Sequence, residues 1–324
     1  MRAALVADLY AIGRHEIVTT ADAGAGHDLP RGVDVVALPA GDRARERTLG
    51  RLIDSADAVW LVAPETDRCL ERLAARVERH RTPLLGSSAD AIRRASDKAR
   101  LPRRLAGLGL RHPETRALDR DVDPVRAADR IGYPIVVKPA RGAGSQGLRL
   151  ARDARELRGA VEFARRSTGA GRILLQHYVR GAAASVSLLA NGRQAVALTL
   201  NAQAIGSSPA FSYRGGQTPF DHPLASRAIA AALETCRALP GLRGFVGVDL
   251  VLTASDAVVI EVNPRITTAY LGVRAAFEEN VAAWVLAACG GDLPSAPRPQ
   301  RRIRFTASGR VVVVGSARPE RGAA

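Results

Sequence analysis

The sequence predicts an α/β protein made of several subdomains. Over roughly the first quarter of the chain, short apolar segments of strand type alternate with segments of helical spacing, which is typical of a parallel α/β domain. Further along, β-branched runs follow one another across short turns, as in antiparallel sheets. At 324 residues the chain is long enough for two or three such units with their own cores.

The first 88 residues contain four segments that we expect to be strands. They are residues 3–7, 33–38, 58–63 and 83–86, and we expect helices at residues 66–81 and 89–95. Ser87 or Ser88 precedes the second helix and can accept a hydrogen bond from its first turn. No GxGxxG motif follows the first expected strand. This part of the chain therefore predicts a small parallel α/β domain without a dinucleotide fingerprint.

The chain carries a formal net charge of +15 and has a sequence pI near 11.1. A strongly basic surface is typical of proteins that bind nucleic acids. The alternative is a general bias towards arginine, which we favour because the arginines are spread along expected helices. Aromatic residues, which stack on bases, make up only 4% of the chain. We therefore expect no nucleic-acid partner, and a homodimer is a further expectation; the small-molecule substrates are those that the family resemblance described below implies.

Cysteine usage and hydropathy bear on location. The three cysteines are widely spaced and form no CxxC motif, which fits a reducing compartment and no zinc site. No apolar run approaches the roughly 18 residues of a membrane span. Asp8 interrupts the apolar run near the start of the sequence, so a signal peptide is not expected. We expect a cytoplasmic protein without a membrane partner.

The arginine bias makes the lysines informative, because the chain contains only two, Lys98 and Lys138. A compact ammonium group is not interchangeable with a planar guanidinium group. Both lysines are therefore candidate phosphate ligands. We expect Lys98 to lie on a helix after Ser96 and Asp97, and Lys138 to end a strand at residues 133–139.

A glycine-rich segment follows Lys138 directly, at residues 141–147. Glycines permit positive φ angles and close approach of the backbone, so successive N–H groups can surround phosphate oxygens. The alternative is a flexible hairpin loop, which the adjacent lysine disfavours. The lysine precedes the glycines, so the segment is not a Walker A motif. A returning strand is expected at residues 148–151.

Two acidic residues lie inside apolar runs near residue 250. Asp249 lies in a run at residues 247–251 and Glu261 in a run that starts at residue 258. If residues 253–256 join two antiparallel strands, the two carboxylates lie side by side, and Asn263 shares the face of Glu261. A surface hairpin is the alternative, but burying unpaired carboxylates is costly. Such oxygen ligands suit Mg²⁺.

The remaining segments predict further strands and helices. Asn191-Gly192 is a strong hairpin signal. Residues 201–223 are polar and contain glycines, and we expect a long functional loop there. Strands are expected at residues 172–178, 184–189, 194–200 and 311–314, and helices at residues 154–166, 223–239 and 278–289.

In this order, the motifs resemble the ATP-grasp superfamily of carboxylate–amine ligases. The resemblance covers residues 96–290 and the preceding α/β domain. It implies an ATP-grasp fold in which two α+β subdomains sandwich ATP. The implied division is an N-terminal pre-ATP-grasp domain at 1–88, a lid-bearing subdomain at 89–175, a metal and substrate subdomain at 176–290, and a C-terminal strand and tail at 291–324.

The resemblance also implies roles for individual residues. Arg265 and Lys138 are the implied catalytic residues, and Asp249, Glu261 and Asn263 are the implied ligands of Mg²⁺, for which Mn²⁺ can substitute. ATP is assigned to Lys98, Lys138, Arg141, Gly142, Gly144, Ser145, Gln146, Gly147, Gln176, His177, Tyr178 and Val179. Two positions depart from the pattern: Gln176 replaces the usual hinge glutamate, and Ala183 stands where a ribose-binding carboxylate is usual, which leaves the ribose contacts open.

Within the superfamily, three motifs resemble the tyramine–glutamate ligases of methanofuran biosynthesis. They are Asn201-x-Gln203, Tyr213-x-Gly215-Gly216 and Thr267-Thr268-x-Tyr270. The implied substrate contacts are Gln203, Tyr213, Gly215, Gly216, Arg265, Thr267 and Tyr270. Tyr270 has a core aromatic role as its alternative.

The function implied by the resemblance is ATP-dependent ligation through an acyl phosphate. The substrate carboxylate attacks the γ-phosphoryl group, and an amine then displaces phosphate. We expect the amino acid to be glutamate and the amine to resemble tyramine. Alternatives are another amino-acid or dipeptide ligase, and a catalytically inactive module that binds nucleotides or nucleic acids.

Overall fold

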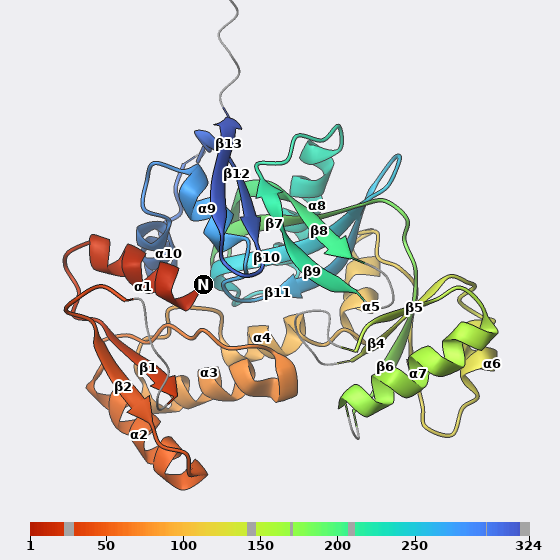
Figure 1. Cartoon of the computed structure of the whole chain (residues 1–324), viewed down its shortest axis with the longest axis horizontal. Helices are drawn as coiled ribbons and strands as arrows, with labels where there is room; N and C mark the ends of the chain where they lie inside the picture. Colours follow the sequence, from red (N-terminus) through yellow and green to blue (C-terminus); the bar gives the residue numbers. More distant parts are fainter. Residues whose placement is uncertain (23–28, 141–146, 169–170, 207–210, 296, 318–324) are drawn as a thin grey trace, which may run out of the picture.

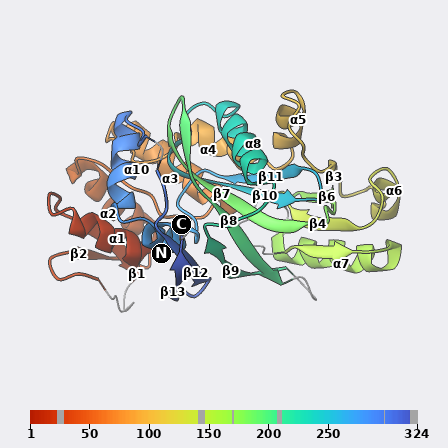
Figure 2. The ribbon, with the colours of Figure 1, turned by 90° about the horizontal axis from the view of Figure 1, so that it is seen from above.

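The computed structural model of the chain describes residues 1–324 except 23–28, 141–146, 169–170, 207–210, 296 and 318–324. It contains a seven-stranded sheet, a four-stranded sheet and an N-terminal α/β segment. Figure 1 shows the four-stranded sheet with its helix α7 at one end of the molecule, the N-terminal segment at the other end and the large sheet above both. Seen from above, α2 and α7 lie at opposite ends (Figure 2).

The N-terminal segment is built on a small parallel sheet, as its alternating pattern predicts. Its elements are α1 (Arg2–Ala11), β1 (Val18–Asp22), β2 (Asp34–Leu38), α2 (Asp42–Ser55), the short 3-10 helix η1 (Thr66–Arg68), α3 (Cys69–His80) and α4 (Ala89–Ala95). β1 and β2 pair in parallel. The strands expected at residues 58–63 and 83–86 are wrong as full strands, because in the described chain they form only an isolated parallel bridge between Val59 and Leu84.

The strand expected at residues 3–7 is also wrong, since these residues belong to α1. Alanine and leucine are strong helix formers, and Leu5 and Leu9 are spaced four apart, so one helical face carries both. This face packs against α10 (Val281–Gly290), where Leu5 is 3% exposed. A five-residue apolar run does not distinguish a strand from a buried helix turn, and the tertiary contact decides.

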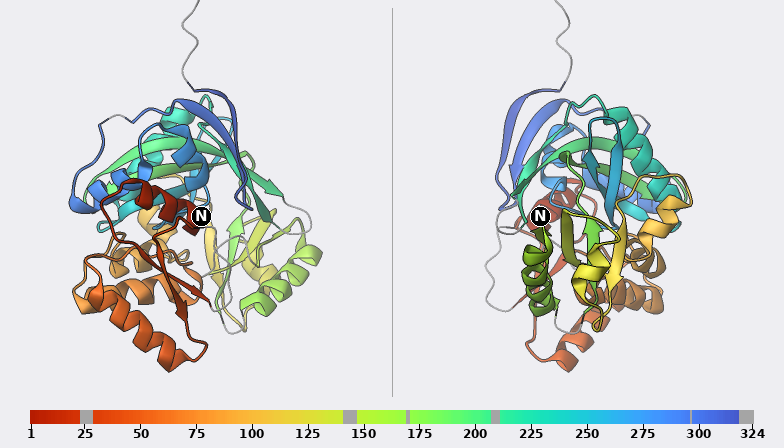
Figure 3. Two further views of the ribbon diagram at one scale, coloured as in Figure 1. Left: turned by 60° about the vertical axis from the view of Figure 1, so that its left-hand side comes forward. Right: turned by 90° about the vertical axis from the view of Figure 1, so that its right-hand side faces the viewer.

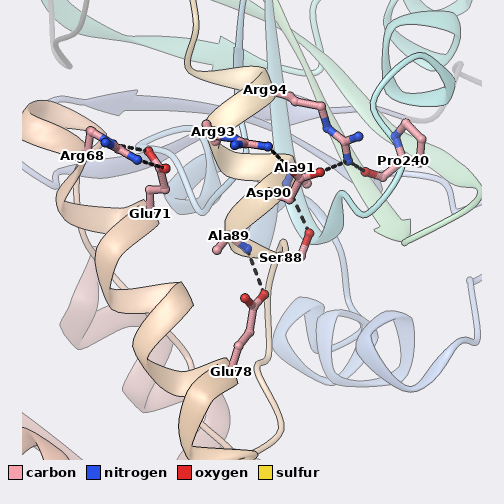
Figure 4. A network of polar contacts seen from close by, with 10 residues as sticks. All are labelled: Arg68, Glu71, Glu78, Ser88, Ala89, Asp90, Ala91, Arg93, Arg94 and Pro240. Atoms are coloured by element: carbon pink, nitrogen blue, oxygen red, sulfur yellow. Dashed lines mark hydrogen bonds and ion pairs between the residues drawn. The ribbon is translucent and has the colours of Figure 1, made fainter.

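Side-chain caps fix the start of α4 and connect it to its surroundings (Figure 4). Ser88 Oγ accepts a hydrogen bond from Ala91 N at 3.2 Å, which confirms one of the two expected caps. Glu78 of α3 accepts from Ala89 N at 2.9 Å. Arg94 donates to Pro240 O at 2.6 Å, and this bond ties α4 to the segment that follows the last helix turn before β10. α4 therefore bridges the N-terminal segment and the large sheet.

The four-stranded sheet has the order β3-β6-β4-β5, with every pairing antiparallel. Its elements are β3 (Thr115–Leu118), α6 (Pro124–Ala128), β4 (Ile135–Pro139), β5 (Arg149–Ala151), α7 (Ala154–Thr168) and β6 (Ile173–His177). α7 covers one face and closes a core of apolar side chains that includes Ile135, Val137 and Leu157, each 0% exposed. The expected strands and helix of this segment are confirmed.

The seven-stranded sheet has the order β11-β10-β7-β8-β9-β12-β13. Its elements are β7 (Ala182–Asn191), β8 (Ala195–Gly206), β9 (Ser212–Thr218), α8 (Ala225–Arg237), β10 (Arg243–Leu252), β11 (Ala257–Asn263), α9 (Tyr270–Ala276), α10, β12 (Arg301–Thr306) and β13 (Val311–Ser316). α8 and the short α5 (Leu101–Ala106) pack on one face, and α9, α10 and α1 contribute to the core on the other. The segment after residue 300 is thus part of this sheet.

The long loop expected at residues 201–223 is wrong for most of its length. β8 continues to Gly206, and β9 pairs antiparallel with both β8 and β12. The polar residues that suggested a loop lie on strands: Asn201 is 0% exposed and its amide group bonds to neighbouring strand side chains. A buried polar face on a strand therefore imitates the composition of a loop.

The N-terminal segment and the four-stranded unit both lie on the same side of the large sheet (Figure 3). At this junction β11 contacts α4, and Val259 N of β11 donates to Arg111 O at 2.9 Å, in the segment that leads from α5 to β3. Among the described residues, no helix combines the length and the apolar character needed to cross a bilayer.

Candidate active site

The two lysines of the chain meet at this junction. Lys98 was expected on a helix, and this prediction is wrong. It lies in the turn between α4 and α5. Asp97 Oδ1 accepts hydrogen bonds from Ala99 N and Arg100 N, both at 3.1 Å, and this turn ends the helical path of α4. The Lys98 ammonium group lies 3.0 Å from Glu261 Oε2 on β11.

Lys138 projects from β4 into the same region and is 3% exposed. Its Nζ donates to Gln176 Oε1 at 2.8 Å, and Gln176 Nε2 donates to Thr115 Oγ1 at 2.8 Å. The pKa of Lys138 is lowered to about 7: burial is the largest cause, the charge of Lys98 acts in the same direction, and the charge of Glu261 opposes both. Gln176 is neutral, so it accepts a hydrogen bond from Lys138 but does not compensate the positive charge of the ammonium group.

The two acidic residues lie directly opposite each other, as expected. Asp249 on β10 and Glu261 on β11 are register partners, next to a bulge after Asp249. Gln203 Nε2 donates to Asp249 Oδ1 at 2.8 Å, and Asn263 Nδ2 donates to Asp249 Oδ2 at 2.9 Å. Three strands of the sheet thus fix one carboxylate.

The pKa values of the two carboxylates are shifted in opposite directions. Burial raises the pKa of Asp249, and the negative charge of Glu261 adds to this increase. Burial also acts to raise the pKa of Glu261, but the charges of Lys98 and Lys138 outweigh it, so the net pKa is lowered. The guanidinium charge of Arg265 lowers both values, which places Arg265 within electrostatic range of both groups.

The donor set suits a hard divalent cation that is bound together with phosphate. Within the described part of the chain, no group of three or more His, Cys, Asp or Glu side chains forms a self-contained metal site. Two adjacent carboxylates with an amide beside them match Mg²⁺, which takes one or two carboxylates and completes its shell with phosphate oxygens and water. Adjacent carboxylates repel each other, and a cation between them removes the repulsion.

The polar side chains extend over one face of the sheet in two rows. Register partners across four strands give the row Glu261, Asp249, Ser185 and Asn201, and the next row is Asn263, Gly247, Ser187 and Thr199. A Cβ atom at Gly247 would lie 3.0 Å from Thr267 Cγ2, so Thr267 covers this face. Tyr213 also lies close, since burial and then the charge of Asp249 raise its pKa. Gln203, Tyr213 and Thr267 therefore lie at the site.

Other expected substrate contacts have structural roles. Gly215 has a φ of +126°, and a Cβ atom there would lie 2.1 Å from Phe305 O. A Cβ atom at Gly216 would lie 2.2 Å from Ala202 O. These glycines permit the close approach of β9 to its neighbours.

Tyr270 is a core aromatic and is 0% exposed. Its hydroxyl group donates to Asp8 Oδ2 at 2.6 Å, and Arg274 Nε donates to the same oxygen at 2.6 Å. The bond connects α9 with α1. The structure thus shows for Tyr270 the core role that the sequence offered as the alternative to substrate contact.

The end of β6 and the connection that follows it to the large sheet carry the residues assigned to adenine. The N–H groups of His177 and Tyr178 donate to Glu114 O and Pro134 O, each at 2.9 Å. The Gln176 side chain points to Lys138 and Thr115, so adenine contact by that side chain would require it to turn. Arg141, Gly142, Gly144, Ser145 and Gln146 lie outside the described residues, and Gly147 has a φ of +73° at the start of the returning chain.

Arg265 has a partner that the sequence did not reveal. Glu65, from the segment before η1, accepts hydrogen bonds on Oε2 from Arg265 Nε at 2.9 Å and from Nη2 at 2.7 Å. The pair is largely buried, with exposed fractions of 16% for Arg265 and 9% for Glu65. The position of Glu65, directly after the apolar run that ends at Pro64, is a signal in the sequence that could have marked it as a candidate. Its partner could not be found in this way, because Arg265 is 200 residues away.

The comparisons with known proteins agree with this geometry. The family model of the ATP-grasp domain matches residues 95–269, and that of the pre-ATP-grasp 3 domain matches residues 15–92. Over 205 residues the chain is 29% identical to the carbamoyl phosphate synthase large chain of Pseudomonas syringae, a match that covers 60% of this chain and 18% of that protein. The chain therefore spans less than a fifth of the length of that relative.

Two further relatives are ligases by name. The tyramine–L-glutamate ligase of Methanocaldococcus jannaschii is 34% identical over 101 residues, or 31% of this chain and 32% of that protein. The structure of an L-amino acid ligase from Bacillus licheniformis aligns with a TM-score of 0.74 at 19% identity, covering 93% of this chain and 76% of that one. This last likeness shows the fold alone. With the family match spanning more than half of its residues, the chain belongs to the ATP-grasp family and carries a pre-ATP-grasp domain before the ATP-grasp domain.

Proposed function

We propose that the protein is an ATP-dependent carboxylate–amine ligase that acts through an acyl phosphate. One observation carries the proposal: both lysines of the chain converge on a pair of register-matched carboxylates. Ammonium groups bind phosphate oxygens, and two carboxylates beside them suit a phosphate-bound Mg²⁺. A site of this composition is arranged for a metal–triphosphate complex.

In this proposal, the residues of the chain bind and orient the reactants. Lys98 and Lys138 hold phosphate oxygens. Asp249, Glu261 and Asn263 hold Mg²⁺, which neutralises charge on the transferring phosphoryl group when it is bound. Arg265 lies within electrostatic range of both carboxylates and stabilises the negative charge on the phosphoryl group and the acyl phosphate. Phosphoryl transfer needs positioning and charge neutralisation more than covalent chemistry from the protein.

The nucleotide enters this arrangement between the two sheets. In our proposal the glycine-rich segment at residues 141–147 covers the phosphates, and the backbone at residues 177–179 meets adenine through groups that the sheet does not already use. Ala183 lies on β7 opposite Val251, and no carboxylate stands at this position to hold the ribose. We expect the affinity for the nucleotide to depend mainly on the phosphate contacts.

For the substrates, we propose glutamate as the amino acid and a primary amine such as tyramine, in methanofuran-type cofactor biosynthesis. The support is the local similarity to tyramine–L-glutamate ligase, together with Gln203, Tyr213 and Thr267 at the site. Another amino-acid or dipeptide ligase is the alternative that a substrate screen decides. The cytoplasmic location and the homodimer expected from the sequence stay predictions.

The test is an assay of ADP release and product mass. The purified protein is incubated with ATP and Mg²⁺, each amino acid and a panel of amines that includes tyramine. Glutamyl-tyramine as the product supports the full proposal, and another amide product corrects the substrates only. Absence of ADP release with every pair would refute the ligase proposal.

Variants link the activity to the site. Lys138→Ala and Glu261→Ala should abolish turnover, and Lys138→Arg should rescue it poorly because a guanidinium group needs more room than the buried site offers. Glu46→Gln is a matched control, because Glu46 is exposed and pairs with Arg76 away from the site. Wild-type rates in either alanine variant would refute the assignment of the site.

A further inference from the structure

Glu65 brings the pre-ATP-grasp segment into contact with the active site. Its Oε2 accepts two hydrogen bonds from Arg265, and Arg265 Nη1 donates to Ile266 O at 3.1 Å. The guanidinium group is therefore held on three of its nitrogens. With this orientation it lies within electrostatic range of Asp249 and Glu261.

The geometry of the pair differs from that of an ion pair arranged for stability. A carboxylate and a guanidinium group commonly form two parallel hydrogen bonds that use both carboxylate oxygens. Here both donors of Arg265 converge on Oε2, while Oε1 of Glu65 is buried and has no hydrogen-bond partner among the described residues. A buried oxygen without a partner costs free energy. The arrangement favours the orientation of Arg265 over the complete satisfaction of Glu65.

The backbone shortly after Glu65 is also held in an unfavourable conformation. Asp67 and Arg68, which are not glycines, have positive φ angles of 50° and 59° in succession. Such residues persist only where their surroundings fix them, and they gather at functional sites. Here Arg68 Nε donates to Glu71 Oε2 at 2.9 Å, a pair drawn at the start of α3 in Figure 4. Leu70 N donates to Pro64 O at 3.0 Å and closes the turn.

We propose that Glu65 is a positioning residue of the ligase reaction, which fixes the guanidinium group of Arg265 toward the reacting groups. The pre-ATP-grasp domain thereby takes part in catalysis through one side chain. Glu65 itself need not touch a substrate in this role. The proposal rests on the proposed function for the identity of the reaction, and on the Glu65–Arg265 contact for the residue.

The kinetic test compares Glu65→Gln and Glu65→Asp with the control Glu46→Gln. We expect Glu65→Gln to lower kcat about 100-fold, because misplacement of a positioned group by about 1 Å costs a factor of this size. The KM for ATP should change by less than about twofold, since the phosphates are held elsewhere. Glu65→Asp keeps the charge and should recover part of kcat. Glu65→Gln with unchanged kcat would overturn the proposal.

A double-mutant cycle separates positioning from general stability. If Glu65 acts through Arg265, the double variant Glu65→Gln, Arg265→Lys should be no slower than Arg265→Lys alone. If the loss of kcat in the double variant equals the product of the losses in the two single variants, the proposal is overturned. Thermal unfolding of each variant shows whether the measured samples are folded, and Glu65→Asp carries the comparison if Glu65→Gln does not fold.

A structural test does not depend on turnover. Crystal structures of the wild type and of Glu65→Ala are determined with Mg²⁺ and a non-hydrolysable ATP analogue. We expect one conformation of Arg265 in the wild type and a displaced or divided side chain in the variant. An unchanged Arg265 would overturn the inference even if the enzyme is active. Failure of the wild type to turn over any substrate pair refutes the proposed function instead, and these crystals still decide the role of Glu65.

Discussion

The lowered pKa of Lys138 makes ATP affinity depend on pH in a way that can be measured. Burial lowers this pKa from 10.5 to about 7, so at pH 7 about half of the free enzyme carries a neutral Lys138. A bound triphosphate favours the ammonium form. ATP binding above pH 7 must therefore take up a proton, and each pH unit costs about a factor of ten in affinity, or about 1.4 kcal/mol.

The magnitude follows from the titration of this one group. The Kd for ATP should rise about 50-fold between pH 7 and pH 9, as the charged fraction of Lys138 falls from about one half to about one hundredth. Isothermal titration calorimetry in two buffers of different ionisation enthalpy measures both Kd and proton uptake. Uptake should rise from about 0.5 proton at pH 7 towards one proton at pH 9.

The same shift affects folding stability without ligand. Because the folded-state pKa lies below the value of 10.5 for an ordinary lysine, the unfolded chain binds more protons between pH 7 and about pH 10.5. This group therefore makes the free energy of unfolding increase as pH rises through that window. Its destabilising effect is complete below pH 7.

Gln176→Glu is the variant that tests the cause. A carboxylate in place of the amide oxygen, now 2.8 Å from Lys138 Nζ, would pair with the ammonium group and raise its pKa. The pH dependence of Kd should then flatten between pH 7 and pH 9. Lys138→Arg keeps its charge throughout this range and serves as the control for ionisation of the nucleotide. An equal slope in wild type and Gln176→Glu, or a flat wild type, would show that the reasoning is wrong.

Two further predictions test the assignments made on the sheet. Gly215→Ala should lower stability by roughly 1–3 kcal/mol, because its Cβ atom would meet Phe305 O at a positive φ angle, and its thermal midpoint can be compared with that of Gly159→Ala, where nothing lies within 4 Å. Equal midpoints would contradict the structural role. Tyr270→Phe should lower stability by about 1–3 kcal/mol through the lost bond to Asp8 and leave the KM of the amine unchanged. An increase in this KM would return Tyr270 to the substrate site.

The hairpin that carries the acidic pair could be predicted because its determinants are local. Apolar β-branched residues on either side of a short turn set the strands, and their alternation sets which side chains share a face. Asp249 and Glu261 are register partners, as that pattern requires. The two lysines could be singled out from composition alone, although their approach to Glu261 depends on the packing of separate segments.

Other features depend on contacts that are distant in sequence. The run at residues 3–7 becomes helical because Leu5 packs against α10, almost 280 residues later. Glu65 meets Arg265 across 200 residues, and no local pattern specifies that contact. Local propensity is a weak determinant of structure where tertiary packing compensates for it.

The prediction of a loop at residues 201–223 was wrong because this segment contributes polar side chains to the site. On β8 the face toward α8 is apolar, as at Leu200, whereas the opposite face carries Asn201 in the row that contains Asp249. The polar face of an ordinary half-exposed sheet faces solvent, whereas the polar face of β8 is buried at the site. Its buried polar side chains satisfy one another, as Asn201 does with Ser185 and Ser187.

Polar residues inside a strand are therefore informative about the site itself. Burying Asn201 at 0% exposure is favourable only if its amide group is fully bonded, which fixes the spacing of β7 and β8 beneath the carboxylates. The same spacing places Gln203, two residues further along the same face, on Asp249 Oδ1. The sheet is polar where it forms the floor of the site. This one property explains why the segment does not show a simple strand pattern and how its side chains support the acidic pair.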